Sequence, residues 1–104
     1  MKIYTKSQIE NCIDVPLILK ELEKGLILYS EKQVEIAPVG FMHFKNPLGD
    51  VHVKSGYIPG DDFYVIKIAS GFYENSNLGI SSSNGLMLLF SQKTGELKAI
   101  LHDE

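Results

Sequence analysis

The sequence predicts an α+β fold in which two N-terminal helical segments precede a mostly antiparallel sheet of about six strands. Apolar residues recur at helical spacing between residues 15 and 30, which indicates a helix with one apolar side. From residue 34 onward that pattern gives way to short alternating runs that are typical of strands. Turn-forming residues separate the runs at intervals that suit hairpins, and helices followed by hairpins are typical of α+β domains.

Capping signals predict the N-terminal elements. Residues 2–5 form a short apolar and aromatic run that indicates a first strand. The sequence from Thr5 to Gln8 matches a capping box and predicts a helix over residues 7–12. Asp14 offers a second N-cap, and a proline in the following turn suits the start of a long helix over residues 15–30.

The remaining chain reads as strands joined by turns. A Pro-Gly-Asp-Asp turn at residues 59–62 and a Lys-Thr-Gly turn at residues 93–95 predict two hairpins. Residues 70–83 are rich in Gly, Asn and Ser and predict a long polar loop, of a length that is usually functional. The run at residues 85–90 is nearly all apolar and is expected to be buried on both faces. Strands are predicted at residues 34–37, 40–44, 50–58, 63–69, 85–90 and 96–101.

Length, charge and cysteine content limit the classes of protein. The 104 residues suit one domain, residues 1–104, with enough chain for a core. The net charge of −3 and the lack of a basic stripe argue against a nucleic-acid partner. Cys12 is the single cysteine, so no intrachain disulfide is possible, and we expect it to be core or helix packing. Without a signal peptide or a membrane-spanning run, a cytoplasmic protein with no membrane partner is expected.

Lys67 is the most informative residue because it interrupts the otherwise apolar strand at residues 63–69. Its side chain could extend from the sheet into water, or it could be a desolvated ammonium that binds a carboxylate or polarises a carbonyl. Lys54 alternates with Asp50 and His52 on one face of its strand and is expected near Lys67 across the hairpin. That face is either a solvated polar surface or a charged wall of a ligand cleft.

Metal and nucleotide sites are not predicted. The three histidines, His43, His52 and His102, do not have the spacing of a metal-binding motif, so we expect no metal ligands. No glycine-rich phosphate-binding motif occurs, so no cofactor-binding residue is expected in this chain.

Four stretches of the sequence resemble a known family. They are GDVHVKSGY at residues 49–57, VIKIASGFY at residues 65–73, SSNGLM at residues 82–87 and KTGELKA at residues 93–99. They are similar to the N-terminal domain of the ornithine cyclodeaminase/mu-crystallin family. The resemblance implies an NAD(P)-dependent, two-domain protein. Its N-terminal domain would contact a small amino acid, imine or keto acid and form a homodimer with a shared barrel-like core, and a Rossmann domain would follow.

The resemblance also implies roles for single residues. Lys67 matches the substrate lysine of the family and is the expected catalytic residue. Ser82 falls where members often carry a hydroxyl near the substrate. The family usually has a carboxylate-clamping arginine on the strand after the long helix, whereas this chain contains no arginine. Either Lys54 replaces that arginine, or the chain is a non-catalytic module for ligand binding or dimerisation.

The resemblance ends before the family's nucleotide-binding domain, which in its members follows the region matched here. We therefore expect NAD(P) to serve the full-length protein and expect this chain alone to bind no cofactor. A chain that supplies only one wall of the active-site cleft is expected to be inactive by itself.

Overall fold

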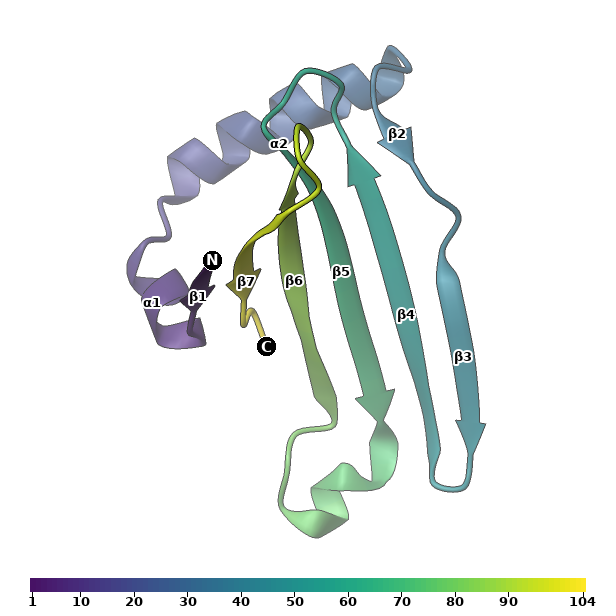
Figure 1. Cartoon of the computed structure of the whole chain (residues 1–104). Helices are drawn as coiled ribbons and strands as arrows, with labels where there is room; N and C mark the ends of the chain where they lie inside the picture. Colours follow the sequence, from purple (N-terminus) through teal and green to yellow (C-terminus); the bar gives the residue numbers. More distant parts are fainter.

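A computed structural model describes all residues from Met1 to Glu104 (Figure 1). Two helices lie in the N-terminal part and a single sheet is formed by the rest of the chain together with a short first strand. The elements are β1 (Lys2–Tyr4), α1 (Lys6–Asn11), α2 (Val15–Ser30), β2 (Glu35–Ile36), β3 (Gly40–Lys45), β4 (Leu48–Tyr57), β5 (Phe63–Phe72), the 3₁₀ helix η1 (Tyr73–Leu78), β6 (Ser83–Ser91) and β7 (Leu97–Leu101).

The sheet has seven strands in the order β1-β7-β6-β5-β4-β2, and β3 also pairs with β4. Both β2 and β3 lie along the same edge of β4, at its two ends. Every pairing is antiparallel except the parallel pairing of β1 with β7. The predicted α+β class is therefore confirmed: the seven strands correspond to the predicted first strand and the six that follow the helices, and the sheet is open.

The helix starts follow the capping signals. The Thr5 hydroxyl accepts a hydrogen bond from the backbone N–H of Gln8 at 3.2 Å, and the Gln8 side chain accepts one from the Thr5 N–H at 2.9 Å. The Asp14 carboxylate accepts a hydrogen bond from the N–H of Leu17 at 3.2 Å. These bonds satisfy N–H groups that have no partner within the helix. Helix α2 spans the predicted residues, and α1 begins and ends one residue earlier than predicted.

The predicted loop at residues 70–83 was partly wrong. Strand β5 continues to Phe72, since its last residues pair with β4 on one side and β6 on the other. The chain then forms η1 before it enters β6 at Ser83. Ser70 and Gly71 are weak strand formers, and only the pairing with both neighbours reveals the strand.

The expected core is missing from the single chain. Only three residues are buried: Gly49, Ser91 and Ala99. The accessible surface is 7892 Å², whereas a compact monomer of this mass exposes about 5,800 Å². The radius of gyration is 15.8 Å, against about 13 Å for a compact domain of this length. No second layer packs over the sheet, so strand β6 is half-buried rather than buried on both faces, and Cys12 is exposed.

Helix α2 also leaves its apolar side chains exposed. Figure 1 shows it running crosswise to the strands, near the end of the sheet where β4 joins β5. It makes little contact with any strand. Neither helix is long and apolar enough to cross a membrane. The exposed apolar residues of α2 include Leu17, Ile18, Leu19, Leu22, Leu26 and Ile27.

Candidate functional site

Alternation along β4 and β5 gives the sheet two different faces. The strand register pairs Lys54 with Lys67 and Val53 with Ile68, so the two lysines share one face and the two aliphatic residues share the other. The predicted division of β4 into a charged side and an apolar side is therefore confirmed. We name these the polar face and the apolar face. The polar face carries the charged side chains of β4 and β5 together with some apolar ones: Asp50, His52, Lys54, Gly56, Phe63, Val65, Lys67, Ala69, Gly71, Ser83, Gly85, Met87, Leu89 and Ser91. The apolar face has no charged side chain and carries Gly49, Val51, Val53, Ser55, Tyr57, Tyr64, Ile66, Ile68, Ser70, Phe72, Asn84, Leu86, Leu88 and Phe90.

Lys67 lies at the centre of the polar face, between Lys54 on β4 and Met87 on β6. Its side chain is 39% exposed, and its Nζ is 3.5 Å from Oδ2 of Asp103. The ammonium is thus only partly desolvated, and it points toward a carboxylate on its own face. Like charges directly opposite each other on neighbouring strands are destabilising, so Lys54 and Lys67 concentrate positive charge at the centre of the polar face.

Asp103 was not predicted from the sequence. Leu101 at the end of β7 pairs with Met87, and the N–H of the next residue, His102, donates a hydrogen bond to the Tyr4 carbonyl at 2.9 Å. This bond keeps the chain extended past β7, so Asp103 lies on the same face as Leu101 and Lys67. The Asp103 side chain is 22% exposed, and its buried Oδ1 accepts no hydrogen bond from the chain.

The residues next to Lys67 along the polar face are small. Ala69 pairs with Gly85, and Gly71 pairs with Ser83. A Cβ atom at Gly85 would overlap the carbonyl oxygen of Ile68, so this position requires glycine.

A second polar cluster occupies the far end of the same face. The Tyr73 hydroxyl donates a hydrogen bond to Oδ2 of Asp50 at 2.9 Å, and this bond together with the negative charge of Asp50 raises the pKa of Tyr73. Nδ1 of His52 lies 3.9 Å from Oδ1 of the same carboxylate. The Phe41 ring lies beside the His52 ring, with the two centroids 4.7 Å apart. The alternation along the strand predicted that Asp50 and His52 share a face, but Tyr73 could not be placed beside them, because Asp50 and Tyr73 are 23 residues apart.

Ser82 is not brought to the lysines. It lies in the connection before β6, where its carbonyl accepts a hydrogen bond from the N–H of Phe72 at 2.9 Å. Strand spacing places it about 15 Å along the sheet from Lys67. Its predicted role near a substrate stays a prediction.

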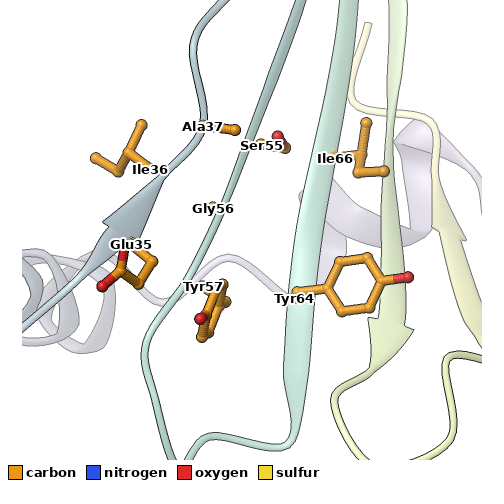
Figure 2. A pocket seen from close by; sticks show the side chains of 8 residues that line it. All are labelled: Glu35, Ile36, Ala37, Ser55, Gly56, Tyr57, Tyr64 and Ile66. Carbon is orange, nitrogen blue, oxygen red and sulfur yellow. The ribbon is translucent and has the colours of Figure 1, made fainter.

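A groove with a volume of about 430 Å³ lies on the opposite side of the sheet from Lys67 (Figure 2). Its side chains come from β2, β4 and β5 and belong to the apolar face or its rim. An apolar lining of this kind suits contact with another apolar surface better than it suits a charged ligand. The groove is lined by Glu35, Ile36, Ala37, Ser55, Gly56, Tyr57, Tyr64 and Ile66.

Metal and nucleotide ligands are not assembled on this chain. No three His, Cys, Asp or Glu side chains converge. A dinucleotide is usually held where a glycine-rich turn leads from a parallel strand into a helix. Here the one parallel strand, β1, is followed by Thr5 rather than by glycines. The residues present therefore do not fit NAD(P).

Sheet and helices define a class of α+β module that occurs as part of much larger NAD-binding enzymes. The Δ1-pyrroline-2-carboxylate reductase of Thermococcus litoralis, solved with NADH and L-proline, superposes with a TM-score of 0.89 at 19% identity, over 97% of this chain and 31% of its own. An archaeal alanine dehydrogenase dimer with bound NAD gives a TM-score of 0.85 at 21% identity, over 95% and 30%. At these identities the likeness shows the fold.

Two curated relatives match nearly the whole sequence. A protein of Rhizobium meliloti (strain 1021), provisionally named a dehydrogenase, is 36% identical over 99% of this chain. The uncharacterized cyclodeaminase y4tK of Sinorhizobium fredii (strain NBRC 101917 / NGR234) is 32% identical over 99%. No family model matches the sequence. Together with the fold, these relatives confirm the resemblance to the ornithine cyclodeaminase/mu-crystallin family. The chain spans 32% of the length of each relative.

Proposed function

We propose that residues 1–104 form the substrate-binding and dimerisation domain of an ornithine cyclodeaminase-like, NAD(P)-dependent oxidoreductase or deaminase. The substrate class is a small L-amino acid or the corresponding imine or keto acid. The observation that carries this proposal is the pair of lysines, Lys54 and Lys67, that lie opposite each other on the polar face. The names of the relatives and of the structural neighbours support the same class of chemistry.

The lysine pair provides a binding site for a carboxylate. Two ammonium groups on neighbouring strands repel each other, and an anion between them removes that repulsion while gaining two charge-assisted hydrogen bonds. Lysine acts as a point charge, whereas arginine would hold the carboxylate by two parallel hydrogen bonds. In this proposal Lys67 is the catalytic residue that contacts the substrate carboxylate, and Lys54 takes the place of the arginine that the chain lacks.

The cofactor is bound elsewhere in the whole protein. When bound, NAD(P) would accept or supply a hydride at the carbon atom of the substrate. Hydride transfer requires the cofactor and substrate to be held together in a fixed geometry. The polar face supplies one wall of such a site, so the chain alone is expected to bind ligand without turnover.

A second copy of the chain is the proposed partner for the apolar face. That face presents rows of aliphatic and aromatic residues that are only half-buried, beside the groove of Figure 2. In soluble proteins, a continuous surface of aliphatic and aromatic side chains is normally covered by another protein surface. The description of the archaeal alanine dehydrogenase as a dimer is consistent with self-association.

Titration of the ¹⁵N-labelled chain by NMR tests the carboxylate site. L-Alanine and pyruvate are expected to shift backbone signals around Lys67 in β4, β5 and β6, and NADH is expected to shift none. Lys67→Met should remove the ligand-dependent shifts. Lys98→Met is the matched control, because Lys98 has a similar exposure of 46% and pairs with Glu96 at 2.8 Å, away from the polar face. Equal binding by wild type and Lys67→Met would exclude the proposed role of Lys67.

The lack of arginine favours a second candidate, a non-catalytic module that binds small carboxylates or serves only assembly. An assay of NADH consumption by the whole protein separates the two. Imine or keto-acid reduction that disappears in Lys67→Met supports the enzyme. Ligand-induced shifts without any NADH consumption across a panel of amino acids, imines and keto acids would support the binding module.

A further inference from the structure

We propose that residues 73–82 form a lid that moves as one unit at the end of the polar face, and that the hydrogen bond between Tyr73 and Asp50 is the latch that holds it. The lid concerns access to the polar face, which the function proposed above does not address. We name residues 73–82, which comprise η1 and the connection to β6, the lid segment. Figure 1 shows η1 beyond the ends of β5 and β6, at the opposite end of the sheet from α2.

The lid segment is held together by its own hydrogen bonds. The Asn75 side chain donates to the Ser81 carbonyl at 2.9 Å, and the N–H of Ile80 donates to the Asn75 carbonyl at 3.2 Å. The N–H of Phe72 donates to the Ser82 carbonyl at 2.9 Å, which joins the two ends of the segment. A loop that is closed at its ends and bonded within itself is a compact body, so we expect it to move as a whole.

The lid segment has few attachments to the sheet. Its apolar side chains pack on nothing, with Leu78 73% exposed and Ile80 57% exposed. Segments with few buried apolar contacts are the first to open in a folded protein. The Asn84 side chain donates to the Ser81 carbonyl at 3.2 Å, but this bond lies where the segment joins β6 and belongs to the hinge. Away from the hinge, Tyr73 is the residue that attaches the segment to β4.

The latch lies on the polar face and can open reversibly. The Tyr73 hydroxyl donates to Oδ2 of Asp50 at 2.9 Å, and the Tyr73 ring lies 3.9 Å from the position of a Cβ atom at Gly71. The negative charge and the hydrogen bond of Asp50 raise the pKa of Tyr73, so its hydroxyl stays a donor at neutral pH. Because the bond is exposed to water, water can replace it at a modest cost in free energy.

The surroundings of the hinge set the direction of movement. On the apolar face the rings of Phe44 and Phe72 lie 5.3 Å apart and block that side. On the polar face the last pair of β5 and β6 is Gly71 with Ser83, which leaves that side open. A released segment therefore turns toward the polar face, where Lys67 lies about 13 Å from Gly71 along β5.

Relaxation-dispersion NMR of the ¹⁵N-labelled chain tests the latch. In Tyr73→Phe the released state is expected to be about tenfold more populated than in the wild type, which corresponds to one exposed hydrogen bond to a charged group. The amides of residues 74–81 should share one exchange rate. Tyr29→Phe is the matched control, because it removes the same hydroxyl from a tyrosine of similar exposure, 60% against 59%, on α2.

A double-mutant cycle identifies the partner of Tyr73. Asp50→Ala, Tyr73→Phe and the double variant should raise the released population by the same factor, because each removes the same bond. Additive effects, or an unchanged population in Tyr73→Phe, would overturn the latch. Unequal exchange rates among residues 74–81 would show local unfolding instead of movement as one unit.

A nitroxide label measures the direction of movement. The label is attached at Ser76→Cys in a chain that also carries Cys12→Ser, so that it reacts at one position. Adding Tyr73→Phe should increase the broadening of the amide signals of Lys54 and Lys67. No increase, with the released population raised, would show that the segment opens away from the polar face and is no lid.

Discussion

Replacing Ile68 by lysine is expected to abolish self-association without unfolding the sheet. Ile68 lies in the middle of the apolar face, between Val53 on β4 and Leu86 on β6. The chain exposes 7892 Å², about 2,000 Å² more than a compact monomer of its mass. A twofold dimer that covers this excess on both copies buries about 4,000 Å² in total, which is in the range of obligate interfaces.

The magnitude follows from the symmetry of such an interface. Burying one isoleucine side chain contributes about 2 kcal/mol, and a lysine at the same place would have to bury an unpaired ammonium as well. A twofold interface contains every residue twice, so the loss is at least about 4 kcal/mol. Each 1.4 kcal/mol changes the dissociation constant by about tenfold. Ile68→Lys should therefore weaken the dimer by about a thousandfold or more.

Sedimentation equilibrium at micromolar concentration measures this effect. The unaltered chain, of 11.6 kDa, is expected to sediment with twice its mass, and Ile68→Lys with its single mass. Ala69→Lys adds the same charge one residue later on the polar face and should remain dimeric. A monomeric wild-type chain that unfolds cooperatively would refute the reasoning, and so would equal dissociation of both lysine variants. Circular dichroism of each variant shows whether the sheet has survived.

Three further predictions concern stability and protonation. Gly25→Ala should raise the free energy of unfolding by about 1 kcal/mol in thermal denaturation, because the added Cβ meets no atom within 4 Å inside a helix. Gly85→Ala should lower it by about 1–3 kcal/mol, because the added Cβ overlaps backbone; effects of the same sign in both variants would contradict the reasoning. Asp50→Asn should lower the pKa of Tyr73 toward its usual value, read from ring ¹³C shifts in a pH titration, because it removes the acceptor charge that raises it. Since that pKa is raised in the folded state, the stabilisation is complete below the unfolded-state pKa and is lost as the pH rises through the folded-state value; an unchanged pKa in the variant would disprove the link.

The sequence predicts the helices well because their signals are local. The capping residues Thr5 and Asp14 lie within three residues of the N–H groups that they bind. Strand ends are harder, since they depend on partners far along the chain. The end of β5 at Phe72 is set by its pairing with Gly49, and a Cβ at that glycine would lie 2.6 Å from the Phe72 ring. Weak strand formers near Gly71 therefore suggested a loop where the sheet continues.

The candidate site could be predicted in part for the same reason. Alternation within β4 and the short turn to β5 were enough to place Lys54 beside Lys67. Asp103 could not be found in this way, because its position depends on the register of β7 against β6 and on the bond from His102 to Tyr4. An acidic residue after a strand has no local pattern that distinguishes it from a solvated one.

Burial was the expectation that failed most clearly, and its failure is informative. Apolar side chains indicate that a face will be covered, but not whether the cover comes from the same chain. Composition and length suggested a chain with its own core, whereas the leucines of α2 remain exposed and the apolar face of the sheet is only half-buried. The sequence pattern predicts which side chains are apolar, and only the resemblance to the family implied that a second copy of the chain covers them.

Each face of the sheet therefore has one unfavourable feature, and a different kind of partner would stabilise each face. On the polar face, Lys54 lies directly opposite the like charge of Lys67, and Asp103 is the one carboxylate that pairs with Lys67. On the apolar face, aliphatic and aromatic side chains contact water. In the proposed function, a small carboxylate would stabilise the polar face and a second copy of the chain would cover the apolar face. Because both faces belong to the same strands, covering the apolar face fixes the strand positions that set the distance between the lysines, and we expect ligand affinity to rise with dimer formation.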